Sequence, residues 1–167
     1  NGIALTEKRI HEVLPFTNIY IQISLNAGMA ESYALIHQTK VQDWERLWKN
    51  LKNLVRIKRE TGSICQLGAN MTVLVKEAFL EDGTRIPPNW PDVELLAFMA
   101  RDTGLDYVSF KPYSQHPYSR ETMKLYGDMS YAGMMDEIVD IGDMLRDLYQ
   151  TEDFEVIFRF SRFKEYE

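Results

Sequence analysis

The segment IYIQISLNAG (residues 19–28) alternates apolar and polar side chains, and this alternation constrains the fold more than any other feature of the chain. Successive side chains of a β-strand point to opposite faces, so the segment predicts a strand with one apolar and one polar face. The apolar face comprises Ile19, Ile21, Ile23 and Leu25, and the polar face comprises Tyr20, Gln22, Ser24 and Asn26. A strand covered by helices on both faces would be apolar throughout. We therefore expect helices on one side of it only.

Three further strand-like runs follow, at about residues 63–75, 106–114 and 154–161. Helical periodicity lies between them, at about 41–61, 92–103 and 131–149. Thr39 is the expected N-cap of the first helix, and Gly62 and Gly104 are expected left-handed stops. The alternation of strands and helices predicts an α/β fold with a parallel sheet and right-handed crossovers.

The polar face recurs on every strand, for example at Gln66 and Asn70, at Ser109 and Lys111, and at Arg159. A doubly wound sheet and a closed eight-stranded barrel would both place apolar residues there. We therefore predict a partial (β/α) TIM-like barrel, a half-barrel with parallel strands and outer helices around a polar interior. Hydrogen bonding among these polar side chains inside an ordinary barrel core is the alternative. The chain reads as one unit, 1–167, with a core to about residue 120 and a following helix and strand in 121–167.

Composition limits the possible partners and location. A net charge of −6 argues against a nucleic-acid partner, and no apolar run is long enough for a transmembrane helix, so no membrane partner is expected. The single cysteine, Cys65, excludes an internal disulfide and fits a cytoplasmic location. It alternates onto the apolar face, where a small core residue is expected. The start at Asn1-Gly2, without a leader, suggests a piece of a longer protein.

The C-terminal ends of the strands read SLNAG, LGANM and FKPYSQHP. These ends are where α/β folds place ligands. No carboxylate pair of a glycosidase, no clustered His and Asp for metal hydrolysis, no nucleophile elbow and no phosphate-binding glycine loop is found there. The residues suit a polar small molecule with hydroxyl and carboxylate groups.

In order and texture, residues 1–120 resemble the second half of the radical S-adenosylmethionine (radical SAM) enzyme core. Asn1-Gly2 looks like the end of that family's third strand, and IQISLNAG resembles its fourth strand. The stretch IHQTKVQDWERLWKNLKNLVRIKRETG resembles the helix that follows, and LGANMTVLV and GLDYVSFKPYS resemble the fifth and sixth strands. The family's CxxxCxxC loop, which binds a [4Fe-4S] cluster, and its Gly-Gly-Glu element would lie upstream of Asn1.

The resemblance implies that the parent protein uses S-adenosylmethionine (SAM) and a [4Fe-4S] cluster, whose ligands this chain lacks. The parent would cleave SAM reductively and use the 5′-deoxyadenosyl radical for hydrogen abstraction from an unknown small-molecule substrate, and this chain alone would be inactive. The implied SAM contacts are Ser24, Asn26, Leu67, Gly68, Asn70, Phe110, Lys111, Pro112 and Tyr113.

Gln115, His116 and Arg159 are the expected substrate contacts. Several of these residues also have structural interpretations. Ser24 and Asn26 could cap the sheet edge, Gly68 could mark a bulge, His116 could anchor a loop and Arg159 could pair with Glu155.

Two other functions stay open. The chain could be a non-catalytic binding or assembly half-barrel whose open sheet edge is covered by the missing N-terminal half or by another chain. It could also be an aldolase- or isomerase-type barrel in which Lys111 forms a Schiff base.

Overall fold

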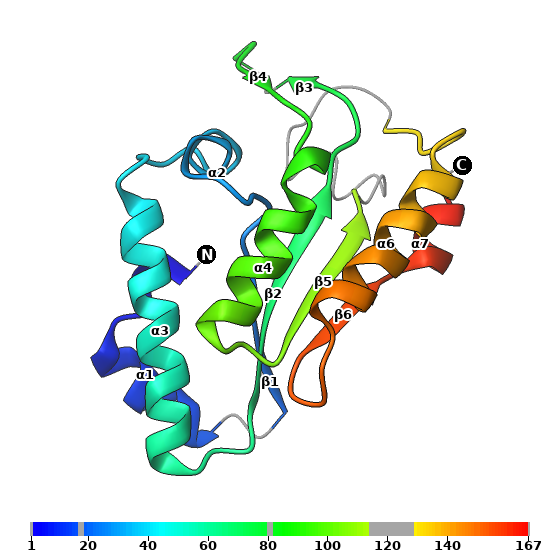
Figure 1. The fold of residues 1–167 in the computed structure, drawn as a ribbon. Helices are drawn as coiled ribbons and strands as arrows, with labels where there is room; N and C mark the ends of the chain where they lie inside the picture. The colour runs from blue at the N-terminus through cyan, green and yellow to red at the C-terminus, as the bar shows by residue number, and fades with distance from the viewer. Residues whose placement is uncertain (1, 17–18, 80–81, 114–128, 167) are drawn as a thin grey trace.

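The computed structural model describes residues 2–16, 19–79, 82–113 and 129–166. Its central sheet has four parallel strands, β1 (Tyr20–Ser24), β2 (Gln66–Val73), β5 (Tyr107–Pro112) and β6 (Glu155–Phe158). They lie in the order β1-β2-β5-β6, so the spatial order follows the chain order (Figure 1). The predicted α/β class with a parallel sheet is confirmed. The strands are shorter than predicted.

Three helices lie side by side over one face of the sheet: α3 (Asp43–Thr61), α4 (Val93–Thr103) and α6 (Met135–Tyr149) (Figure 1). Each has an amphipathic pattern, and its apolar stripe faces the strands. The expected stops are confirmed, because Gly62 and Gly104 adopt left-handed φ angles of 64° and 84° at the ends of α3 and α4. Thr39 is not the N-cap of α3. That helix begins at Asp43, and the Thr39 hydroxyl donates to the Asp43 carboxylate instead.

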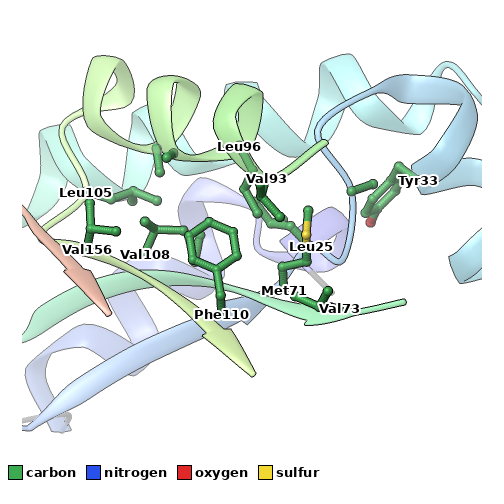
Figure 2. Close-up of a cluster of buried hydrophobic side chains, with 14 of the residues drawn as sticks. Leu25, Tyr33, Met71, Val73, Val93, Leu96, Leu105, Val108, Phe110 and Val156 are labelled. Atoms are coloured by element: carbon green, nitrogen blue, oxygen red, sulfur yellow. The ribbon is translucent and has the colours of Figure 1, made fainter. Parts of the chain in front are cut away.

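The alternation of the strands sorts their side chains as the sequence predicts. Leu67, Ala69, Met71 and Val73 of β2 point to the helices and are fully buried, as is Cys65. Figure 2 shows Met71, Val108 and Phe110 of the sheet packed beneath Val93 and Leu96 of α4. Phe110 also stacks on Phe158 of β6, with ring centroids 4.6 Å apart. The opposite face carries the predicted polar row, in which Gln22, Ser24 and Lys111 are exposed and Asn70 and Ser109 are buried.

The fourth predicted strand is wrong in its last residues. Residues 154–161 were expected to be extended, but β6 ends at Phe158 and the short helix α7 (Phe160–Lys164) follows. Arg159, at φ −85° and ψ 61°, turns the chain between them. Phe158 and Phe160 stay in contact, with ring centroids 5.6 Å apart, and Phe163 is fully buried. Of the aromatic residues that suggested a strand, Phe158 thus lies in β6 and Phe160 in α7, and Phe163 fills the core from that helix.

Several short elements were not predicted. They are the 3₁₀ turns η1 (Gly2–Ala4), η2 (Leu14–Phe16) and η3 (Trp90–Asp92), the helices α1 (Glu7–Val13) and α2 (Ala30–His37), and the antiparallel pair β3 (Ala78–Phe79) and β4 (Arg85–Ile86). Helix α1 packs on α3 through the buried Ile10. Gly2 lies so close to Leu47 of α3 that a Cβ there would be 2.7 Å from its Cδ1 atom. No helix in the described ranges is long and apolar enough to cross a membrane.

Candidate functional site

The polar face of the sheet holds a cavity of about 450 Å³ near the C-terminal ends of β2, β5 and β6. This is the end at which parallel α/β sheets bind ligands. The residues that line the cavity are Gln22, Asn70, Thr72, Ser109, Lys111, Pro112, Tyr113, Arg159, Arg162 and Tyr166. Five of the predicted site residues are among them: Asn70, Lys111, Pro112, Tyr113 and Arg159.

Strand register brings the polar lining side chains together. In the β2–β5 pair Asn70 lies opposite Ser109, and Thr72 lies opposite Lys111. In the β5–β6 pair Phe110 lies opposite Phe158, and the Arg159 amide continues the ladder by donating to the Phe110 carbonyl at 3.0 Å. Lys111 and Arg159 therefore lie side by side, Lys111 on β5 and Arg159 just after β6. Neighbouring strands are about 4.8 Å apart.

The cavity is cationic although the chain is acidic overall. Lys111, Arg159 and Arg162 are part of its lining. Among the described residues that line it, none is acidic. Arg162 forms an ion pair with Glu165 at 3.0 Å. Within the described ranges Lys111 and Arg159 form no ion pair, and the alternative pairing of Arg159 with Glu155 does not occur. Two positive charges on this surface therefore remain without a counter-charge from the described residues.

Asn70 supplies the most unusual polar group of the site. Its side chain is 2% exposed, and its Oδ1 atom accepts no hydrogen bond from the described part of the protein. An unsatisfied buried acceptor costs about 1–3 kcal/mol. Such a group in a cavity wall is suited to a hydrogen-bond donor from a bound molecule.

In the loop after β1, Asn26 has the structural role that was the alternative to SAM binding. Asn26 has a left-handed φ of 57°, and its Oδ1 atom accepts a 2.8 Å hydrogen bond from the Thr72 amide. Its side chain therefore ties the end of β1 to β2, which agrees with the capping interpretation. Ser24 is exposed on the polar face of β1 and does not line the cavity.

Three residues outside the predicted site hold this loop in place. Buried Asn89 donates from Nδ2 to the carbonyls of Asn26 and Thr72 at 2.8 and 2.9 Å, and accepts from the Leu74 amide at 2.6 Å. The Asp92 carboxylate accepts from the Gly28 amide at 2.9 Å. Their positions in the sequence Asn89-Trp90-Pro91-Asp92 carry the signal of a turn before a helix, but nothing in the sequence indicates what they bind.

His37 is the third of these residues. Its Nε2 atom donates to the Leu25 carbonyl at 2.8 Å. Burial lowers the pKa of His37, because the charged imidazolium loses solvation. The neutral ring therefore serves as a donor that fixes the chain where β1 ends.

Three predicted SAM contacts, Leu67, Gly68 and Phe110, pack against other residues of the protein. Leu67 and Phe110 are fully buried on the helix face, so their side chains lie on the side of the sheet away from the cavity. Gly68 is covered by the Tyr107 ring, with which a Cβ at this position would collide. The missing side chain of Gly68 therefore accommodates Tyr107, which lies opposite it in the strand register.

The end of β5 is fixed by a buried tyrosine. The Tyr131 hydroxyl accepts from the Tyr113 amide at 2.7 Å and donates to the Val73 carbonyl at 2.6 Å. Burial raises the pKa of Tyr131, so it remains a neutral donor. Pro112 and Tyr113 are held against the cavity by this contact. Gln115 and His116 lie outside the described residues.

The described residues contain no group of three or more His, Cys, Asp or Glu side chains that could hold a metal ion. Comparison with known proteins adds no assignment: no family model matches the chain, and no curated protein matches it with significance. The site is thus defined by its geometry as a cationic, polar cavity on an α/β sheet.

Proposed function

We propose that this chain is part of a radical SAM enzyme and forms the C-terminal half of its partial (β/α) barrel. The observation that carries the proposal is the cavity at the C-terminal strand ends, on a polar sheet face opposite the helices. The strand order also supports it. The strands lie in space in the order of the chain, as in a barrel, whereas a doubly wound sheet reverses its strand order. The resemblance of residues 1–120 supplies the family.

The open edge of β1 is consistent with further strands. In the described sheet β1 pairs only with β2, and Ile19 and Tyr20 at its start are 75% and 57% exposed. Sheet edges with exposed apolar side chains tend to be covered by another segment or chain. We propose that the third strand of the barrel pairs here in the parent protein and that the first two strands extend the sheet beyond it.

The two cofactors fit this chain differently. A [4Fe-4S] cluster requires several thiolates, and Cys65 is a single thiol, fully buried on the helix face, so this chain does not fit the cluster. SAM fits the polar face better, since the buried Asn70 oxygen is available to a donor and Ser24 is exposed on the neighbouring strand. In the parent the cofactors would supply the radical chemistry, whereas residues of this chain would bind and orient the nucleoside and substrate.

The two alternatives differ in their support. The open β1 edge also suits a non-catalytic assembly half-barrel, and a strictly monomeric chain in solution would count against that function.

A Schiff-base lysine is usually desolvated in a hydrophobic pocket. Lys111 is exposed and flanked by polar residues, which disfavours the aldolase or isomerase reaction. Failure to trap carbonyl compounds with borohydride would remove it.

Two measurements test the proposal. The sequence preceding Asn1 in the parent gene should encode a CxxxCxxC motif, and a parent protein without such a motif would overturn the assignment. Calorimetric titration of the chain with SAM should detect binding that Asn70→Ala weakens and Asn53→Ala, on the outer helix α3, leaves unchanged. Equal affinities of the two variants would contradict a SAM site on this face.

A further inference from the structure

We propose that the cavity binds a second small molecule, an anion that carries a phosphate or carboxylate group together with a hydroxyl or amine donor. The anionic group would lie between Lys111 and Arg159, and the donor would reach Asn70. This inference names the substrate class for the proposed enzyme. It rests on the cavity itself, so it would also stand for a protein that never binds SAM.

The charges favour an anion. Lys111 of β5 lies beside Arg159, the residue that follows β6, and both residues line the same cavity. Like charges on neighbouring strands repel each other, and an anion bound between them would relieve this repulsion. Glu165 already pairs with Arg162, and the described residues offer no acidic partner to the other two. An arginine with a neighbouring lysine is a common receptor for phosphate and carboxylate.

The buried amide requires more than a simple anion. The Oδ1 atom of Asn70 is an acceptor, so an unprotonated phosphate or carboxylate oxygen would repel it. A hydroxyl or amine on the same molecule would satisfy one of its two lone pairs, which leaves the other for a donor of SAM. Thr72 and Ser109 add hydroxyl groups beside Asn70 that can donate or accept.

The size of the cavity agrees with a small metabolite. Its volume of about 450 Å³ lies within the range of small-molecule sites, roughly 300–1,000 Å³. The lining is fixed by the strand ladders and by the Tyr131 contact to Val73 and Tyr113. A pocket held in this way needs little ordering when a ligand binds, which favours affinity.

The test uses two probes that separate the anion chemistries. Calorimetric titrations of the chain with glycerol 3-phosphate and with malate compare a phosphate and a carboxylate that both carry a hydroxyl group, and glycerol serves as the neutral probe. The variants are Lys111→Gln and Arg159→Gln, with Lys52→Gln on the outer face of α3 as the matched control. All three positions are exposed, so the variants should fold, which circular dichroism verifies.

We expect at least one anionic probe to bind, about tenfold more weakly in each cavity variant and unchanged in the control. Glycerol should not bind, and added salt should weaken the anion. No binding of either anion, or equal affinity in all three variants, would overturn the inference. The titrations are repeated with S-adenosylhomocysteine present. Unchanged anion binding supports a separate ligand, whereas displacement would mean that these cations hold the nucleoside's carboxylate and would refute it.

The two proposals can fail separately. Anion binding without any SAM binding by the wild-type chain refutes only the proposed SAM site and leaves the anion site intact. Conversely, SAM binding without any anion binding refutes only the inference about the substrate.

Discussion

Replacement of Asn89 by alanine tests how the cavity is held in shape. The Asn89 side chain is 1% exposed and makes three hydrogen bonds, to the carbonyls of Asn26 and Thr72 and to the amide of Leu74. Alanine would leave one donor and two acceptors without partners, at about 1 kcal/mol or more each. We therefore expect a loss of about 3 kcal/mol in the free energy of unfolding. For a domain of this size that corresponds to a Tm about 6–12 °C lower.

Urea denaturation followed by tryptophan fluorescence measures the loss, and Asn53→Ala on α3 is the matched control. At that partly exposed helical position alanine should change stability by less than about 0.5 kcal/mol, because alanine favours helix. A loss below about 1 kcal/mol for Asn89→Ala would refute the assigned role, since water would then replace the amide at little cost.

Asn89→Asp provides an independent measurement. The carboxylate keeps an acceptor for the Leu74 amide but turns a negative oxygen toward two carbonyls. The variant should be destabilised at neutral pH, and its deficit relative to the wild type should shrink as the pH falls and the carboxyl group becomes a donor. A deficit that does not depend on pH would contradict the donor role of Nδ2.

Three further changes have defined outcomes. Gly68→Ala should cost about 1–3 kcal/mol of stability because its methyl group collides with the Tyr107 ring, and Tyr107→Ser in the same chain should remove most of that cost in a double-mutant cycle. Tyr131→Phe should lose about 2 kcal/mol in urea denaturation, whereas Tyr20→Phe at an exposed position should lose almost nothing. His37 has a pKa below its usual value near 6.5 in the folded chain, so the unfolded chain binds more protons. The stabilisation that the neutral His37 ring provides is therefore complete above pH 6.5 and is lost as the pH falls below 6.5 and through the lowered pKa. Unfolding free energies measured from pH 7 to pH 5 should therefore fall less steeply in His37→Gln than in His11→Gln, and parallel slopes would contradict the burial of the neutral ring.

The sequence predicts the architecture well because the periodicity of buried residues is strong. The alternation at Leu67, Ala69 and Met71 defines which face of β2 meets the helices, and the stripe from Leu47 to Val55 does the same for α3. The pattern did not predict helix α7. Phe158, Phe160 and Phe163 are all apolar and close in sequence, and only the turn at Arg159 decides that the last two lie on a helix.

The candidate site is less predictable, because polar residues at a strand end serve either a ligand or the backbone. Asn26 follows β1 and Asn70 lies on the neighbouring strand β2, and the two look equivalent in the sequence. In the fold Asn26 accepts from the Thr72 amide, while the Asn70 acceptor has no partner in the described protein. The difference depends on Thr72 and Asn89, which approach from elsewhere in the chain. Such long-range contacts have no local sequence signal.

This difference moves the expected ligand position across the sheet. With Asn26 and Asn89 committed to tying β1 to β2, the groups free to bind lie over β2, β5 and the end of β6. The cations of the cavity lie at that far side, whereas the open edge of β1 lies at the other. A nucleoside bound partly by strands beyond β1 would therefore lie on one side of Asn70, and a substrate held by Lys111 and Arg159 would lie on the other. On this arrangement Asn70 is the residue whose replacement should affect both ligands, and Arg159 the one whose replacement should affect the anion alone.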